Sequence, residues 1–248
     1  MHPHDPFAPL QDGSVDAAVD EGRFVGIDPA VLSAADGYRL LLHCVAPRPI
    51  ALTSTLSPDG APNLAPFSYF MAGGANPPSV AISPLTDRSG RPKDTLRNIE
   101  ATGEYVINVV THALREPMNR ASAEFPYGVD EWREAGLTPA PSVRVKPPRV
   151  LESPLAMECR RFRIVPHGDG PLAANYVIGE VVYFHVARSL IPDPEPGTAA
   201  AAVDARGADY IARMGGDWYA RADAAALFEM PRPPRVEKYP PAGPSGGA

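Results

Sequence analysis

Proline is the residue that most constrains how this chain can fold, because it occupies 31 of the 248 positions. That share is well above the average of about 5%. Each proline lacks a backbone N–H donor and disrupts a helix interior. We therefore expect long helices to be scarce, and short strands and loops to be plentiful.

The clearest local signal is a hairpin. The segments "RPIALTSTL" (48–56) and "NLAPFSYFM" (63–71) flank Pro58-Asp59-Gly60, a turn sequence in which proline presets φ and glycine supplies positive φ. The two strands do not alternate cleanly, since Thr53, Ser54 and Thr55 are consecutive. A strand buried on one face should alternate apolar and polar residues, so the hydroxyl run needs another reason.

Further segments follow strand or helix patterns. Apolar, β-branched runs predict strands at 78–85, 104–110, 155–168 and 175–191. Helices are expected from Asp94 or Thr95 to about Ala101 with Gly103 as the stop, within 111–125 with Thr111 as N-cap, and in "DAAALFEMP" (223–231). About six strands without a βαβ rhythm predict a mainly β fold, a small β-barrel with short helices.

The two ends of the chain differ in composition from the middle. We expect residues 1–30 to form an N-terminal extension that is poorly ordered or arm-like, and residues 31–222 to form the barrel domain. Residues 223–248 are expected to form a C-terminal helix and a tail rich in proline and glycine.

Composition narrows the classes of function. The formal net charge is −6 and no run of lysine and arginine is present, which argues against nucleic-acid binding. No stretch approaches the roughly 20 apolar residues of a membrane span, and the first residues do not resemble a secretory signal. The expected location is the cytoplasm.

Common catalytic motifs do not occur in the sequence. It contains no G-x-S-x-G, H-E-x-x-H, G-x-x-x-x-G-K-[ST] or C-x-x-C, and no G-x-G-x-x-G follows a strand. Cys44 and Cys159 suit buried filler positions better than catalysis, and we expect no metal site from the six scattered histidines. His167 could line a nicotinamide pocket, but a surface loop is the simpler interpretation.

One loop has the composition of a phosphate site. "SPLTDRSGRPKDT" (83–95) contains hydroxyls and cations and leads directly into a predicted helix, whose free N–H groups and dipole favour an anion. The hydroxyl-rich hairpin, in turn, combines hydrogen-bonding groups with an apolar surface, as a planar heteroaromatic ring requires. Flavin mononucleotide (FMN) would join the two features, although a solvated loop remains the alternative.

Several ordered motifs resemble the FMN-binding split-barrel proteins of the flavin reductase family, with flavoredoxins and the reductase components of two-component monooxygenases as the most similar members. These motifs are "RPIALTSTLSPDGAPNLAPFSYF", "PPSVAIS", "RPKDTLRNIEATGEYVINVV", "VDEWREAGLTPAPSVRVKPPRVLESPLAMEC", "YVIGEVVYFHV" and "RMGGDWY". The resemblance covers residues 35 to 222. It implies an FMN-binding split barrel.

The resemblance also implies roles for particular residues. The hairpin would line the flavin ring, with Ser68 at its pyrimidine edge, and the loop would hold the phosphate, with Asp94 alongside. The cofactor-binding residues implied are Thr53, Ser54, Thr55, Ala65, Pro66, Phe67, Ser68, Tyr69, Ser83, Arg88, Lys93, Asp94 and Thr95. A homodimer is implied too, in which Met214, Gly215, Gly216 and Trp218 approach the site of the other chain and Tyr219 matches a family tyrosine.

These inferences lead to two hypotheses about function. The first is an NAD(P)H-dependent FMN reductase that passes reduced flavin to a partner monooxygenase or another acceptor. The second is an electron carrier that holds FMN tightly and has no nicotinamide-dependent activity. A split barrel whose site has changed to another ligand, or to none, is a third interpretation. Because hydride transfer to flavin needs no acid or base from the protein, we assign no catalytic residue.

Overall fold

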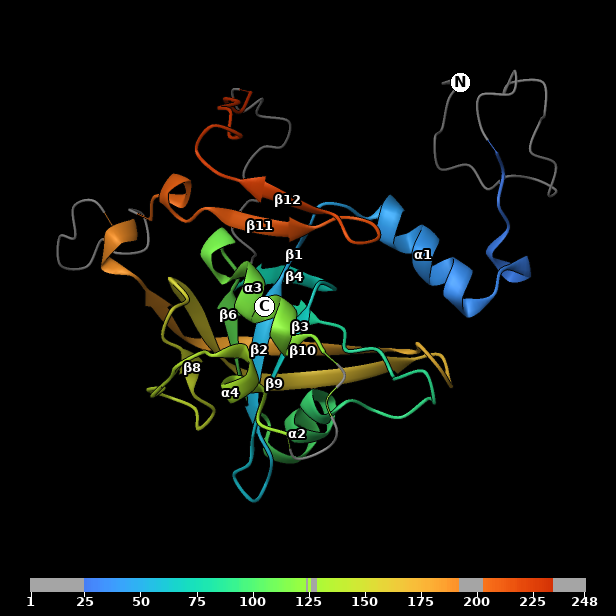
Figure 1. Ribbon diagram of the computed structural model, residues 1–248, viewed down its shortest axis with the longest axis horizontal. Coiled ribbons are helices and arrows are strands. Elements are labelled where there is room, and N and C mark those ends of the chain that lie inside the picture. The colour runs from blue at the N-terminus through green and yellow to red at the C-terminus, as the bar shows by residue number, and fades with distance from the viewer. Residues whose placement is uncertain (1–24, 124, 126–128, 192–202, 234–248) are drawn as a thin grey trace, which may run out of the picture.

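Seven antiparallel strands form the main sheet of the computed structural model, which describes residues 25–123, 125, 129–191 and 203–233 (Figure 1). Their order is β3-β2-β6-β9-β10-β5-β4. The strands are β2 (Ala51–Leu56), β3 (Pro62–Phe67), β4 (Phe70–Ala75), β5 (Pro78–Ile82), β6 (Glu104–Val109), β9 (Leu155–His167) and β10 (Ala174–Val186).

The connection between β3 and β4 forces this sheet to curl. The two strands lie at opposite edges of the order, yet only Ser68 and Tyr69 separate them along the chain. Six strand spacings in a flat sheet would be about 29 Å, whereas three Cα–Cα steps reach at most about 11 Å. The sheet therefore closes on itself into a barrel, in which β3 and β4 lie on either side of an unpaired seam.

Smaller elements surround the barrel. β1 (Arg48–Pro49), β11 (Tyr210–Arg213) and β12 (Tyr219–Ala222) form a three-stranded sheet, and β7 (Pro139–Ala140) pairs with β8 (Arg149–Val150). Figure 1 shows α2 at the lower end of the barrel and the β11–β12 hairpin across its upper end. The helices are α1 (Ala34–Cys44), α2 (Asp94–Thr102), α3 (Arg115–Ala121) and α4 (Glu131–Ala135), with short 3₁₀ turns at Pro29–Val31, His112–Leu114, Arg188–Leu190 and Ala205–Gly207.

Apolar side chains bury both faces of the sheet around β2. One cluster includes Ala51, Phe67 and Val177 together with α2 residues, and the other packs Leu52 and Leu64 under α3 and α4. As a central strand covered on both sides, β2 is buried from Ala51 to Thr55. Its missing alternation therefore has a packing reason, because a strand buried on two faces has no solvent side.

The mainly β barrel that the sequence predicts is confirmed. The hairpin turn is present with Gly60 at φ +89°, and α2 ends at Gly103 with φ +72°. The strands expected within 78–85, 104–110, 155–168 and 175–191 correspond to β5, β6, β9 and β10.

Other expectations need correction. "NLAPFSYFM" is not one strand but the end of β3, a bend at Ser68-Tyr69 and the start of β4. The N-cap of α2 is Lys93, one residue before Asp94 and two before Thr95, the expected positions. The expected helix at 223–231 is wrong: a turn is followed by irregular chain, in which Leu227 and Phe228 are exposed rather than packed.

Other sequence predictions lie partly outside the described residues. These are the extension before residue 25 and the tail after residue 233. Within the described ranges, no helix is long and apolar enough to cross a membrane.

Candidate functional site

The two halves of the sequence-predicted site lie at opposite ends of β3. Asn63, near the start of the strand, contacts α2, and Ser68, just after its end, contacts Arg48. Five residues of extended strand span about 16 Å, which is comparable to an extended FMN molecule. Because β3 is an edge strand, its outer side is not paired with another strand.

A buried polar cluster joins the hairpin to the phosphate loop. The Asn63 amide donates to Thr55 Oγ1 at 3.0 Å and to Thr95 Oγ1 at 2.9 Å, and the Asn98 amide donates to Thr55 Oγ1 at 3.0 Å. All four side chains are buried. Thr55 of the hairpin and Thr95 of the loop are therefore brought together, but both are covered there and bonded to these asparagines. Asn63 and Asn98 were not predicted, although Asn63 stands in the quoted motif.

The N-terminus of α2 presents donors and charge. Lys93 caps the helix without a side-chain hydrogen bond, so the first N–H groups of α2 receive none from it. The Lys93 ammonium lies 6.0 Å from the centre of the Phe67 ring, which connects the loop to the end of β3. Lys93 and Arg88 are exposed, whereas Asp94 is half-buried and pairs with Arg97 at 3.3 Å. These features suit a phosphate.

Asp87 organises the loop that carries Arg88. Its carboxylate accepts from Ser89 Oγ at 2.6 Å, Ser89 N–H at 2.8 Å and Arg91 N–H at 2.9 Å, and it pairs with Arg91 Nε at 3.1 Å. The Ser89 hydroxyl, followed by the Arg91 N–H, holds the pKa of Asp87 well below its usual range. Arg91 is therefore already paired with Asp87. Arg88 makes no ion pair among the described residues.

Two hydroxyls near the seam have no hydrogen-bond partner. Ser83 Oγ and Tyr69 Oη are both buried and unpaired, and the Ser83 N–H donates to the Tyr69 carbonyl at 2.8 Å. Unpaired buried hydroxyls cost free energy unless a ligand or water satisfies them. A polar ligand at the β3–β4 seam would supply the missing partners, so these residues fit a flavin with its many hydrogen-bonding atoms.

Three predicted ring contacts are covered by the protein itself. Thr53, Ser54 and Thr55 are fully buried. Ser54 points to the opposite face from its neighbours and donates to the Pro148 carbonyl, and Thr53 Oγ1 donates to the Ala51 carbonyl at 3.3 Å. All three residues lie on β2, the strand paired with β3, and are not exposed at the β3 edge. The partly exposed Ala65, Pro66, Ser68 and Tyr69 form the surface itself, and Phe67 is buried beneath them.

Arg48 is a site residue that sequence reasoning missed. Its side chain lies beside Ser68, with Nε 3.4 Å from Ser68 Oγ, and donates through Nη2 to the Met214 carbonyl at 2.7 Å. Through Nη1 it donates to the carbonyls of Leu42, at 2.6 Å, and Val45. Arg48 is the first residue of the predicted hairpin segment "RPIALTSTL", and a cation at that position was the available signal.

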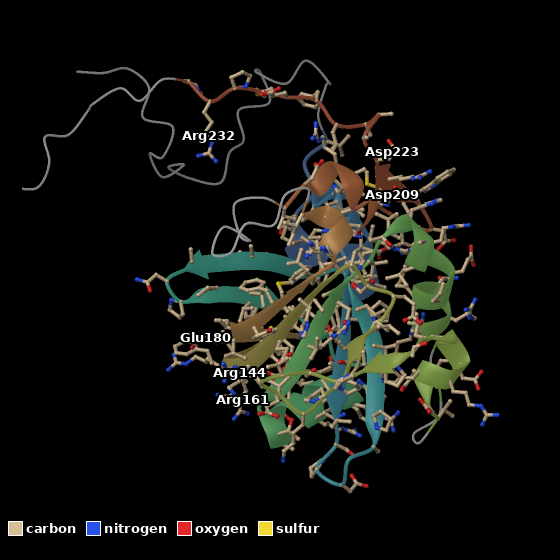
Figure 2. All side chains as sticks on the ribbon, turned by 90° about the vertical axis from the view of Figure 1, so that its left-hand side faces the viewer. Arg144, Arg161, Glu180, Asp209, Asp223 and Arg232 are labelled. Atoms are coloured by element: carbon tan, nitrogen blue, oxygen red, sulfur yellow. The ribbon has the colours of Figure 1, made fainter. Side chains whose placement is uncertain are left out.

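The "RMGGDWY" segment approaches the ring end of its own chain. Met214 N–H donates to the Trp218 carbonyl at 3.0 Å, which closes the Gly-Gly turn, and Arg48 holds the Met214 carbonyl. Figure 2 shows Asp209 and Asp223 beside this hairpin, where Arg221 pairs with both. Tyr219 stacks under Arg213 at 4.5 Å. Contact with a second chain stays a prediction.

Other sequence candidates lie elsewhere. His167 ends β9 and stacks on Tyr176 with ring centres 6.4 Å apart. Cavities of about 440 Å³, lined by residues of α2, β9 and β10, and of about 450 Å³, between α3 and β11–β12, include none of the predicted cofactor residues. The predicted strip along β3 is therefore a surface outside those two cavities.

The fold is that of a split-barrel protein, and the polar strip is a candidate site along its seam. Comparisons with known proteins agree: the Flavin reductase like domain matches residues 42–200. A split-barrel protein from Shewanella frigidimarina, named as a flavin reductase, aligns over 86% of this chain and all of its own, with a TM-score of 0.68 and 24% identity. At that identity the likeness shows the fold.

More similar proteins extend this result. The chain is 36% identical over 209 residues to an uncharacterised protein of Halalkalibacterium halodurans, which covers 84% of this chain and 96% of the relative. Nitrilotriacetate monooxygenase component B from Bacillus cereus has a TM-score of 0.73 and 34% identity, over 84% of this chain and 98% of its own. The chain belongs to the flavin reductase-like family, and a flavin is the cofactor that this membership indicates.

Proposed function

We propose that this protein is an NAD(P)H-dependent FMN reductase. The observation that carries the proposal is the paired arrangement along β3, with donors and charge for a phosphate at one end and hydroxyls with Arg48 at the other. Membership of the flavin reductase-like family supports it.

The residues present would hold FMN in a defined orientation. The N–H groups of α2, with Lys93 and Arg88, would bind the phosphate. Ser83 was predicted as a phosphate residue, but its N–H donates to the Tyr69 carbonyl, so it lies at the ring end instead. The β3 edge from Ala65 onward, with Ser68, would bind the ring. When bound, FMN would supply two-electron redox chemistry, with NAD(P)H as the hydride donor. The protein positions the ring, excludes water from its buried side and provides hydrogen bonds to its polar edge.

The acceptor of the reduced flavin is proposed to be a partner monooxygenase. The similar Bacillus cereus protein is named as a component of nitrilotriacetate monooxygenase, which indicates a two-component system for that relative. If this chain works in the same manner, FMN exchanges during turnover. A carrier would instead retain its FMN through gel filtration, and that retention without oxidation of NADH or NADPH would favour the second hypothesis.

Flavin analogues test where each part of FMN binds. Lys93→Ala should weaken FMN at least tenfold in a fluorescence titration and leave riboflavin, which lacks the phosphate, unchanged, because an ion pair with phosphate contributes on the order of 1.5–3 kcal/mol. Arg97→Ala, a cation on the same helix, is the matched control. Equal losses for FMN and riboflavin would place the phosphate elsewhere.

A second copy of the chain is proposed to complete the protein as a homodimer. The support comes from α1, which extends away from the barrel in Figure 1 and buries none of its residues. Leu41 on this helix and Val45, its C-cap, are about half exposed. An isolated helix of 11 residues is marginal in water, so α1 needs a surface to pack on.

A further inference from the structure

Arg48 is a buried cation without an acidic partner. Its side chain is 3% exposed, and within the described part of the chain no carboxylate forms an ion pair with it. Burial lowers the pKa of the Arg48 guanidinium, but a guanidinium stays protonated in proteins. A full positive charge is therefore held inside the protein by neutral groups alone.

The partners of Arg48 orient the charge but do not neutralise it. Three backbone carbonyls accept from its guanidinium, two at the end of α1 and one at Met214 before the Gly-Gly turn. The negative end of the α1 dipole offsets part of the desolvation cost. Arg213 lies close enough to raise that cost further, since like charges repel. A buried charge retained under these conditions is a candidate for a functional role.

Ser68 connects this charge to the proposed flavin site. Ser68 Oγ faces Arg48 Nε at 3.4 Å, so the hydroxyl oxygen accepts from the guanidinium side. A hydroxyl has one proton to donate, and a hydroxyl that accepts from Arg48 directs that proton away from it. The Ser68 O–H therefore remains free to donate to a ligand at the seam. The hydroxyl and the charge behind it act on the same polar edge of a ligand.

We propose that Arg48 sets the redox balance of the bound flavin by favouring the reduced form over the oxidised form. Reduction adds negative charge to the pyrimidine part of the ring, and a fixed positive charge in a low-dielectric site stabilises that charge without reorganisation. Arg48 acts through Ser68 and through its field, as a positioning residue. This inference rests on the proposed binding of FMN at the seam.

The test compares how tightly each redox state of FMN binds. In Arg48→Met, reduced FMN should lose about tenfold more affinity than oxidised FMN, which corresponds to a fall of about 30 mV in the midpoint potential of the bound two-electron couple. Arg48→Lys, which keeps the charge, should restore at least half of that shift. Arg160→Met, at an exposed arginine of β9 that pairs with Glu104, should leave the potential unchanged.

Each outcome separates the two proposals. If wild-type protein binds no FMN, the proposed function fails. If FMN binds but Arg48→Met weakens both redox states equally, Arg48 has only a structural role and the inference fails. Should Arg48→Met not fold, Arg48→Gln removes the charge but keeps N–H donors for the surrounding carbonyls. An unchanged potential in that variant would likewise overturn the inference.

Discussion

Gly179 leaves space inside the barrel for the side chain of Tyr105. A Cβ at this position would lie 1.8 Å from the Tyr105 hydroxyl, and Tyr105 is fully buried. Glycine on β10 therefore leaves the space into which the phenol from β6 projects. A glycine inside a strand pattern signals close approach, and the sequence marks the position in "YVIGEVV" without revealing which side chain approaches.

Glu158 is a second residue whose structural role cannot be inferred from the sequence. It is fully buried, and its carboxylate accepts from the Val143 N–H at 2.7 Å, the Val145 N–H at 3.1 Å and His185 Nε2 at 2.6 Å. Burial by itself raises the pKa of Glu158, but the hydrogen bonds from Val143, His185 and Arg144 outweigh it and the net pKa is lowered. This residue fixes the 143–145 loop to β9.

Stability should depend on the ionisation of Glu158. Because its pKa is lower in the folded state, its contribution is complete above the unfolded value of about 4.5 and disappears as the pH falls through the folded value. Glu158→Gln should lower the free energy of unfolding by about 2–4 kcal/mol near neutral pH, since the amide leaves backbone N–H groups unpaired. Urea unfolding at several pH values measures this cost.

The control for this prediction is Glu180→Gln, which changes an exposed carboxylate on β10 (Figure 2). It should change stability by less than about 0.5 kcal/mol. The cost of Glu158→Gln should shrink in acid, where the wild-type carboxyl is protonated as well. A cost that stays constant at every pH would contradict the ionic role.

At the scale of elements, local signals located most of the barrel. The turn at Pro58-Asp59-Gly60, the stop at Gly103 and the apolar runs of β6, β9 and β10 each follow from residues close in sequence. The short β11 and β12 carry weak local patterns and depend on pairing with β1 and each other. The wrong helix at 223–231 has good local helix formers but no surface to bury them.

α1 is an element that packing within one chain does not explain, because none of its residues is buried. In a homodimer its exposed leucines would be covered, so Leu41→Asp should weaken the dimer at least tenfold, because burying a charge at an interface is costly. Analytical ultracentrifugation across a concentration series measures the shift. Leu151→Asp, at a leucine exposed to a similar degree in a turn, is the control. A monomeric wild-type protein would refute the proposed dimer.

At the scale of the whole molecule, the site depends on barrel closure. β2, β3, α2 and the segment before β12 each contribute contacts to it, and these are distant in sequence. A ligand that bridges them should stabilise the entire fold, since a ligand that binds only the folded state shifts the unfolding equilibrium.

FMN should therefore raise the melting temperature. At a concentration about 100 times its Kd, it adds about 2.7 kcal/mol, which corresponds to roughly 5–10 °C for a chain of this size. Riboflavin at the same concentration should raise it less, because it lacks the phosphate. Differential scanning calorimetry provides the measurement. An equal rise with both ligands would show that the α2 end does not bind phosphate.

The sequence by itself determined most strands of the barrel, the hairpin turn, the end of α2 and the resemblance that names the family, because each depends on neighbouring residues or on ordered motifs. It also indicated Lys93, Ser68 and Thr95. Only the tertiary structure decided that Thr53 and Ser54 are covered, that Asn63 joins Thr55 to Thr95, and that Arg48 lies behind Ser68. Those relations arise when the sheet closes, and closure brings together residues whose partners no local pattern specifies.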